Sequence, residues 1–390
     1  MNKTPIDYAE LACEALMHRY APDELPPEKI LFYHQGVFLS GMENVYRLTK
    51  NKKYFKYIKK YVDSCISADG EVYGISYEVT ELKNDDGLSD WVKKNAIAML
   101  DCKQPVILLY NLYQETGEEK YRKAIETISK SMYYWPVNVF GGYWHMMTQH
   151  NQMWMDGAYM AGPLSVMYSH YFNDECLRER AINQIIIMDE HIKDEKTGLY
   201  FHGWDASFEA GWADKKTGCS KEIWGRAVGW YAVAILDMLD YIPNDHEKVK
   251  KLEDIVISLL KTLANYCDEK TGCWYQVLDK PYEKGNWIES SATCLFIYSY
   301  AKAIRKGLIS KVKYGDILNK AYKGMIDSLY YDEEGYLVID NVCIGTCIED
   351  GTYEYYINRD TVKNDLHGAG AFILMCAEME RFNKLDEGEM

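Results

Sequence analysis

The chain has 390 residues, of which 48% are hydrophobic and 26% charged, and this ordinary balance excludes an intrinsically disordered protein. The formal net charge of −15 argues against a nucleic-acid partner, because phosphate binding needs clustered Lys and Arg, although one or two cations would suffice for a small anionic substrate. Tyr (34) and Trp (10) together far outnumber Phe (10), and such polar-edged rings suit either stacking on sugars or the packing of long helices.

Several kinds of sequence motif are absent, and their absence limits the localisation and the chemistry that we expect. No apolar signal core opens the chain and no run of about 20 apolar residues follows, which predicts a cytoplasmic protein without a membrane partner. The 11 cysteines are scattered through apolar runs, as at Cys13 and Cys376, without zinc-ligand spacing, so we expect reduced core thiols and no metal. Phosphate-loop, dinucleotide, H-E-x-x-H and G-x-S-x-G motifs do not occur, which favours acid/base chemistry without a cofactor.

Two kinds of helix alternate along the chain. Helices that are small and apolar nearly all round, and so must be buried, are predicted over 36–46, 104–113, 157–171, 227–239, 291–303 and 368–379. Amphipathic helices are predicted over 53–64, 118–133, 174–191, 246–267 and 312–330. The first set is expected inside and the second outside.

Between each amphipathic helix and the next apolar one we expect a turn with Gly followed by an aromatic residue. These turns cover 69–73, 140–144, 194–200, 268–274 and 332–336. The spacing of their glycines, about 55 to 75 residues, suits helical hairpins and is too long for tetratricopeptide-like repeats. Six hairpins closed into a ring predict an all-α (α/α)6 toroid, a six-hairpin barrel, as a single domain over residues 1–390.

In such a ring the inner helices run in one direction, so the polar residues that start them converge on one mouth. Asp101 and Asp156 start the second and third inner helices, Trp224 and Arg226 start the fourth, and His202 lies in the turn before it. The fifth and sixth begin with Glu289, Ser290, Asp365 and His367.

Each of these side chains has two interpretations. Asp101 and Asp156 are either ordinary helix N-caps or two carboxylates that face one cavity, where their environments produce one acid and one base. Trp154 and the small residues around Asp156 favour the second. Arg226 sits among apolar residues and pairs with a carboxylate of either the protein or a substrate. His202 is either a satisfied loop residue or a donor to a sugar oxygen.

Three segments carry a family resemblance: Gly141-Gly-Tyr-Trp-His145, Gln152-Met-Trp-Met-Asp-Gly157 and Trp224-Gly-Arg226. Together with His202-Gly-Trp204 and a closing hairpin that includes Gly368-Ala-Gly-Ala-Phe372, they resemble the unsaturated rhamnogalacturonyl hydrolases of glycoside hydrolase family 105, relatives of the unsaturated glucuronyl hydrolases. The resemblance covers most of the chain beyond about residue 95.

The resemblance implies a hydrolase that removes a 4,5-unsaturated uronic acid, galacturonyl or glucuronyl, from the non-reducing end of small lyase-generated oligosaccharides such as rhamnogalacturonan disaccharide. It implies that Asp156 protonates C4 and then takes a proton from the water that attacks C5, while Asp101 stabilises the oxocarbenium-like cation. For Asp156 to hold a proton near neutral pH, we expect burial against Trp154 and the charge of Asp101 to raise its pKa.

The resemblance also implies substrate-binding residues, namely His202, Arg226, Trp154, Trp224 and Trp230. One departure from the family pattern is Met146, because many members have Lys after the Trp-His pair. This change puts the usual uronate contact or the preference for the following sugar in doubt. The segment Tyr33-His-Gln-Gly36 lies where the family also brings aromatic residues to the site.

Three other functions stay open at this point. A sugar epimerase or isomerase shares the toroid and uses paired histidines at its mouth, for which His202 and His367 are candidates. An inverting glycosidase would use Asp156 and Asp101 on saturated sugars. A non-catalytic glycan-binding or scaffold protein is the third, and Met146 is its only support.

Overall fold

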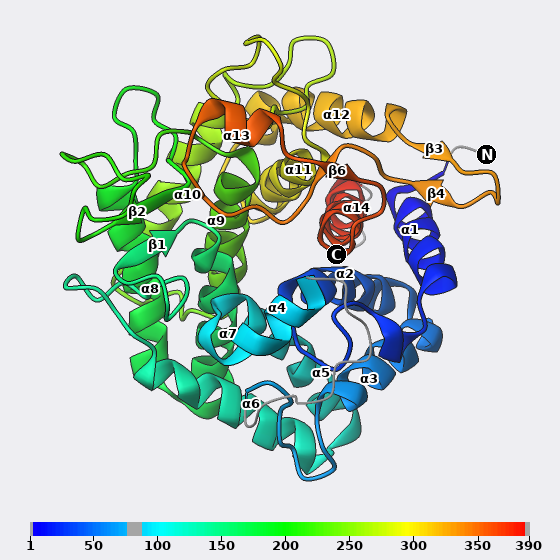
Figure 1. Ribbon diagram of the computed structural model, residues 1–390. Helices are drawn as coiled ribbons and strands as arrows, with labels where there is room; N and C mark the ends of the chain where they lie inside the picture. The colour runs from blue at the N-terminus through cyan, green and yellow to red at the C-terminus, as the bar shows by residue number, and fades with distance from the viewer. Residues whose placement is uncertain (1–2, 76–87, 387–390) are drawn as a thin grey trace.

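Two concentric rings of helices surround one axis in the computed structural model, which describes residues 3–75 and 88–386 (Figure 1). The inner ring comprises α2 (Tyr33–Thr49), α5 (Ile107–Thr116), α7 (Gly157–Phe172), α9 (Gly225–Met238), α11 (Ser290–Arg305) and α14 (Leu366–Asp386). The outer ring comprises α1 (Pro5–Arg19), α3 (Lys52–Cys65), α6 (Glu119–Ser131), α8 (Glu175–His191), α10 (Val249–Leu263) and α12 (Lys311–Asp327). The predicted (α/α)6 barrel is confirmed.

Burial explains why the two rings differ in composition. In α9 every residue except Asp237 is buried, and in α11 every residue except Arg305 is, so both helices have to be apolar or small almost all round. In α3 the buried residues recur at helical spacing, as Tyr54, Tyr57, Ile58 and Tyr61 do, while the lysines between them face solvent.

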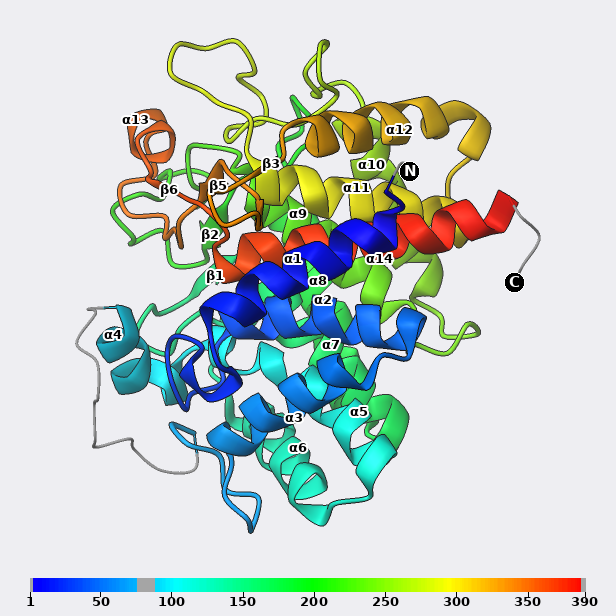
Figure 2. The same cartoon turned by 90° about the vertical axis from the view of Figure 1, so that its right-hand side faces the viewer.

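The ring closes through the two ends of the chain. On the inner side α14 packs against α2 and α11, and on the outer side it is covered by α1 (Figure 2). Helix α1 was not among the predicted elements, yet it supplies the sixth outer helix. It begins with a capping box in which the backbone N–H of Thr4 donates to Oδ2 of Asp7 over 2.7 Å.

The predicted turns between outer and inner helices are tight antiparallel hairpins. Each turn contains a glycine with a positive φ, as at Gly198 (+74°) and Gly272 (+79°), a conformation that side-chain-bearing residues rarely adopt. In the turn at Gly198, its N–H donates to the carbonyl of Asp194 over 2.8 Å, and Lys193 pairs with Tyr200.

Short elements gather at one end of the barrel. They include α4 (Leu88–Asn95), α13 (Tyr353–Ile357) and the 3-10 turns η2 (Ala96–Ala98), η3 (Leu100–Cys102) and η4 (Gln104–Val106). Two further 3-10 turns are η1 (Pro22–Glu24) and η5 (Met132–Tyr134). Antiparallel pairs join β1 (Gln152–Trp154) to β2 (Gly203–Asp205), β3 (Tyr330–Tyr331) to β4 (Leu337–Val338), and β5 (Val342–Cys343) to β6 (Thr361–Val362). None of the helices in the described part of the chain combines the length and apolarity needed to cross a bilayer.

Candidate active site

The inner helices begin around a pocket of about 220 Å³ at the end of the barrel that carries these short elements. Its lining comes from several connections and helix starts: Phe32, Tyr33, His34, Trp91, Met99, Asp101, His145, Met146, Trp154, Asp156, Gly345, Thr346 and Cys347. Both predicted catalytic carboxylates and Trp154 therefore face one cavity, as the common direction of the inner helices requires.

Neither Asp156 nor Asp101 serves as a helix cap. Asp156 is the N-cap residue of α7, but its side chain accepts no hydrogen bond from the helix backbone. Asp101 lies in η3, and no side-chain cap bond occurs there either. Instead, Oδ2 of Asp156 lies 3.1 Å from Nε2 of His202, and Oδ2 of Asp101 lies 3.2 Å from Nε2 of His145. The capping interpretation is thus wrong for both, and the carboxylates are available for chemistry.

Two short backbone pairings set these carboxylate–histidine contacts. The β1–β2 register places Trp154 opposite Gly203, and the N–H of Met155 donates to the carbonyl of His202 over 2.9 Å. Asp156 and His202 thereby meet, although 46 residues separate them. A second pairing joins Leu100 N–H to the carbonyl of His145 over 3.3 Å, which brings Asp101 beside that ring.

The protonation states at the Asp156 pair follow from its surroundings. Burial favours the neutral carboxyl, but the hydrogen bond from His202 and the charges of His145 and Arg226 outweigh it and lower the pKa of Asp156. The expectation of a raised pKa is therefore wrong, because the sequence interpretation weighed the carboxylate of Asp101 without these cationic neighbours. Burial also lowers the pKa of His202, so its ring is neutral.

Tyr356 fixes the tautomer of His202. Its Oη lies 2.7 Å from Nδ1, and burial raises the pKa of Tyr356 well above its ordinary value, so the phenol keeps its proton and donates it to Nδ1. Nε2 then carries the proton that points at Asp156. At the second pair, burial opposes a charge on His145, but Asp101 outweighs it and raises the pKa of the ring.

Arg226 lies behind the pocket wall. Its guanidinium donates to the carbonyl oxygens of Cys343 and Ile344, the latter over 2.8 Å, and lies 4.0 Å from Glu289. Glu289 caps α11 and also accepts the N–H of Cys343 over 2.9 Å. Arg226 is 1% exposed and stacks over Trp224, so it holds the loop that carries Gly345–Cys347 into the pocket.

The three predicted tryptophans occupy different depths. Trp154 lines the pocket and stacks on His145, with ring centroids 4.5 Å apart. Trp224 lies one layer deeper, against His202, and donates from Nε1 to Gln276 over 3.0 Å. Trp230 is fully buried inside the barrel and stacks on Tyr159.

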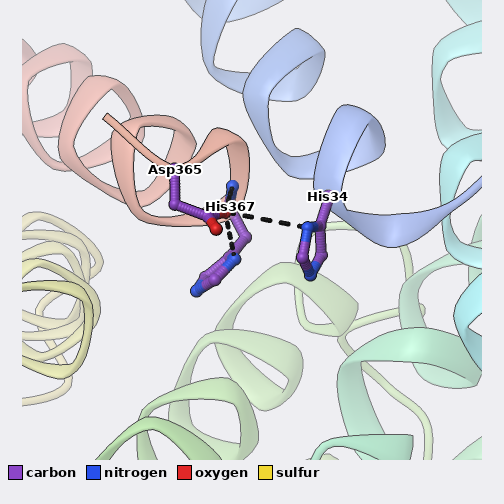
Figure 3. A group of neighbouring side chains, drawn as sticks. All are labelled: His34, Asp365 and His367. Atoms are coloured by element: carbon purple, nitrogen blue, oxygen red, sulfur yellow. Dashed lines mark hydrogen bonds and ion pairs between the residues drawn. The ribbon is translucent and has the colours of Figure 1, made fainter. Parts of the chain in front are cut away.

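A third buried cluster joins the starts of α2 and α14 (Figure 3). Oδ1 of Asp365 lies 2.6 Å from Nδ1 of His367 and 3.7 Å from Nδ1 of His34, a grouping whose ligand atoms are close enough for a metal ion. The other nitrogen of His367 lies 3.1 Å from the carbonyl of Cys343. Nδ1 of His367 is buried and makes no hydrogen bond within the described part of the chain, although the Asp365 carboxylate lies close to it.

Some residues that line or support the pocket had no role assigned from the sequence. His145 stands inside the Gly141–His145 segment, so the resemblance could have supplied it. Tyr356 is marked only by its place in the closing hairpin. Trp91, on α4, follows no motif at all, and only the fold brings it to the pocket.

A helical barrel whose mouth presents two carboxylates beside aromatic rings has the architecture of a carbohydrate-active enzyme. The model for Glycosyl Hydrolase Family 88 matches residues 8–383, and the chain belongs to this family. It is a glycoside hydrolase, which removes the epimerase and non-catalytic interpretations.

Individual relatives agree with this assignment. A C. acetobutylicum glycoside hydrolase from family 105 superposes with a TM-score of 0.86 at 29% identity, covering 96% of this chain and 99% of that one. The unsaturated rhamnogalacturonyl hydrolase YesR of Bacillus subtilis is 24% identical over 80% of this chain and 79% of its own length. The unsaturated glucuronyl hydrolase of Bacillus sp. GL1, at 13% identity and a TM-score of 0.68 over 97% of this chain and 96% of that one, shares the fold. The family resemblance seen in the sequence is confirmed.

Proposed function

We propose that the protein removes a 4,5-unsaturated uronic acid, galacturonyl or glucuronyl, from the non-reducing end of lyase-generated oligosaccharides such as rhamnogalacturonan disaccharide. The names of the B. subtilis and Bacillus sp. GL1 relatives support this substrate class. The observation that carries the proposal is the position of Asp156, whose carboxylate is free of the helix backbone and faces a pocket that also holds Asp101.

The reaction adds water across the C4=C5 bond. Protonated Asp156 donates its proton to C4 of the vinyl ether, and the positive charge that results is shared by C5 and the ring oxygen, where Asp101 stabilises it. Water then bonds to C5 and gives a proton back to Asp156. The C5 hemiketal opens to a ketone, and the acetal carbon C1, now a hemiacetal, expels the neighbouring sugar as an alcohol.

The low pKa of Asp156 sets a requirement on the substrate. A proton donor has to be protonated in the complex, yet His202, His145 and Arg226 favour the ionised carboxylate. A uronate carboxylate bound nearby adds a negative charge, which raises the pKa of Asp156 and loads it with a proton. Hydration is thereby coupled to the binding of an acidic sugar.

Of the remaining predicted residues, some contact the substrate in this proposal and others only support the residues that do. Trp154 is the wall on which the unsaturated ring stacks, since it lines the pocket directly. His202 orients Asp156, and Trp224 supports His202. Arg226 and Trp230 have indirect roles: Arg226 holds the loop that carries Gly345–Cys347, and Trp230 packs inside the barrel. The packing of α1 on α14 supports a further part of the proposal, namely that residues 1–390 form one catalytic domain.

The deciding measurement is loss of the ultraviolet absorbance of the conjugated unsaturated uronate. Wild type is expected to consume it on a rhamnogalacturonan-derived disaccharide, and Asp156→Asn to be slower by about 10³-fold or more with unchanged circular dichroism. Absence of turnover on unsaturated uronides from several polymers, with hydrolysis of saturated oligosaccharides instead, would favour an inverting glycosidase that uses the same two carboxylates.

A further inference from the structure

Met99 and Met146 form an apolar pair in the wall of the pocket. They face each other across an antiparallel bridge, flanked by the Leu100–His145 hydrogen bond and by a bond from Met147 N–H to the carbonyl of Ala98 over 2.9 Å. In this register the two residues do not bond to each other, so their side chains come close on one face. Both line the pocket.

No lysine or arginine belongs to the part of this wall that the structure describes. Among the described residues that line the pocket, none is Lys or Arg, whereas Asp101 and Asp156 are acidic. Two arginines outside the lining contact its loop: Arg226 donates to the carbonyl groups of residues 343 and 344, and Arg359 donates to the carbonyl of Gly345 over 2.6 Å and to the hydroxyl of Thr346 over 3.1 Å. The cationic character that remains in the lining belongs to histidine, above all to His145 against Asp101.

An exposed aromatic ring lines the same pocket. Trp91 on α4 lines the pocket yet is 41% exposed, so part of its indole stays open at the rim. A large apolar ring left in water at a pocket entrance is the kind of surface on which the C–H face of a sugar packs.

We infer that Met99, Met146 and Trp91 form the subsite for the sugar next to the unsaturated uronate, and that they select a neutral sugar with an apolar face over a sulfated or acidic one. This inference rests on the proposed function and names its leaving sugar. A sulfate or second carboxylate here would be desolvated against two thioethers and placed near two carboxylates, and the described residues of the lining offer it no Lys or Arg partner. A neutral deoxy sugar loses little hydration on the same surface.

The test compares kcat/KM for three substrates that share the unsaturated uronate: one followed by rhamnose, one by a 6-sulfated amino sugar, and a methyl glycoside without a second sugar. Wild type should prefer the rhamnose compound to the sulfated one by about tenfold or more, the scale of a buried unpaired charge. Met146→Lys should reduce this preference at least about fivefold, because the ammonium pairs with sulfate. Met147→Lys, the matched control outside the pocket lining, should leave the preference unchanged.

A second variant keeps the inference testable if Met146→Lys does not fold. Trp91→Ala should lower kcat/KM about tenfold for the rhamnose disaccharide and leave the methyl glycoside unaffected, while Tyr134→Ala, at a residue 88% exposed outside the lining, should change neither. Equal or faster turnover of the sulfated disaccharide by wild type would overturn the subsite while the proposed function stands. Failure of all three compounds, the methyl glycoside included, would refute the proposed function itself.

Discussion

His145 and Trp154 lie face to face, with their ring planes 15° apart. His145 pairs with Asp101, and Trp154 stands two residues before Asp156, so one aromatic stack links the surroundings of both carboxylates. Asp101 raises the pKa of His145 and so favours a positive charge on this ring, and the indole face stacked on it stabilises such a charge. Asp156 and Asp101, the proposed acid and the proposed cation-stabilising carboxylate, are therefore positioned as one unit.

Removal of the charge at Asp101 should slow the reaction without unfolding the protein. Asp101→Asn keeps the shape but loses both the stabilising charge and the partner of His145, so we expect kcat to fall about 10²-fold with little change in KM. Asp240→Asn, at the opposite end of the barrel beside Lys302 and Lys306, is the matched control. A comparable loss in both variants would show that Asp101 acts only through folding.

The hydrogen bond from His202 should set the alkaline limit of activity. This bond helps to lower the pKa of Asp156, so His202→Ala should raise that pKa. Because the acid works only while protonated, the alkaline limb of kcat/KM should move to higher pH by about one to two units, the equivalent of one charged hydrogen bond. The rate maximum should fall as orientation is lost.

A pH–rate profile of Tyr356→Phe provides the companion measurement. Loss of the phenol frees Nδ1 of His202, so the ring can carry its proton there and leave Asp156 without a donor. The limb should move in the same direction by a smaller amount. A shift to lower pH in either variant would contradict the assignment of Asp156 as the acid.

The fold could be predicted from the sequence because its pattern is local. A helix that is buried all round and a helix with one solvent-exposed face differ in their local amino-acid composition, as α9 and α3 do. Helix α1 escaped prediction because it completes the barrel mainly by packing on α14, at the other end of the chain. No pattern within residues 5–19 indicates this contact with α14.

The position of the candidate site could be predicted from the sequence, but the pKa shifts of its residues could not. Asp101 and Asp156 were found because every inner helix starts at the same mouth. The pKa of Asp156, however, depends on His202 and His145, which reach it through backbone pairings between separate connections. The sequence motifs contain both histidines but do not tell which carboxylate each one meets.

Burial of His34 should make the protein less stable in acid. Burial lowers the pKa of His34 to about 3, despite the nearby Asp365 carboxylate. Between its ordinary pKa of 6.5 and 3, the unfolded chain binds a proton that the folded protein does not, so stability falls as the pH drops through that range. The slope is at most about 1.4 kcal/mol per pH unit for this one residue.

Urea unfolding at several pH values checks this contribution. His34→Gln should flatten the decline in unfolding free energy between pH 6.5 and 4. His18→Gln, at a side chain that is 53% exposed, is the control and should leave the profile as in wild type. An unchanged slope in His34→Gln would mean that the ring is protonated in the folded protein.

Position 157 should require a glycine, because His145 occupies the space that a side chain there would need. A Cβ at Gly157 would lie 3.3 Å from Nδ1 of His145 and 3.4 Å from Cδ1 of Leu100, so Gly157→Ala should push the ring away from Asp101. We expect kcat to drop about threefold to tenfold, because small displacements of catalytic groups are costly. Gly315→Ala in outer helix α12 meets only Lys311 Cγ at 3.6 Å and should instead stabilise the protein by about 0.5–1 kcal/mol. Equal kcat in both variants would exclude this packing role.

Arg226→Lys should loosen the loop that carries Gly345–Cys347. The planar guanidinium joins two successive carbonyl groups, those of Cys343 and Ile344, and a lysine ammonium has no fork to do the same. We expect the free energy of unfolding to fall by about 2–4 kcal/mol and KM to rise, since the loop forms part of the pocket wall.

Arg305→Lys is the control that separates an effect on stability from an effect on KM. Arg305 pairs with Glu378 at the other end of the barrel, where Nε lies 2.6 Å from Oε1, so this substitution should reduce stability while KM stays at the wild-type value. Calorimetry and steady-state kinetics on both variants make the comparison. If Arg226→Lys retained the wild-type KM while losing stability, the loop would not depend on the guanidinium, and Arg226 would be a support of the barrel alone.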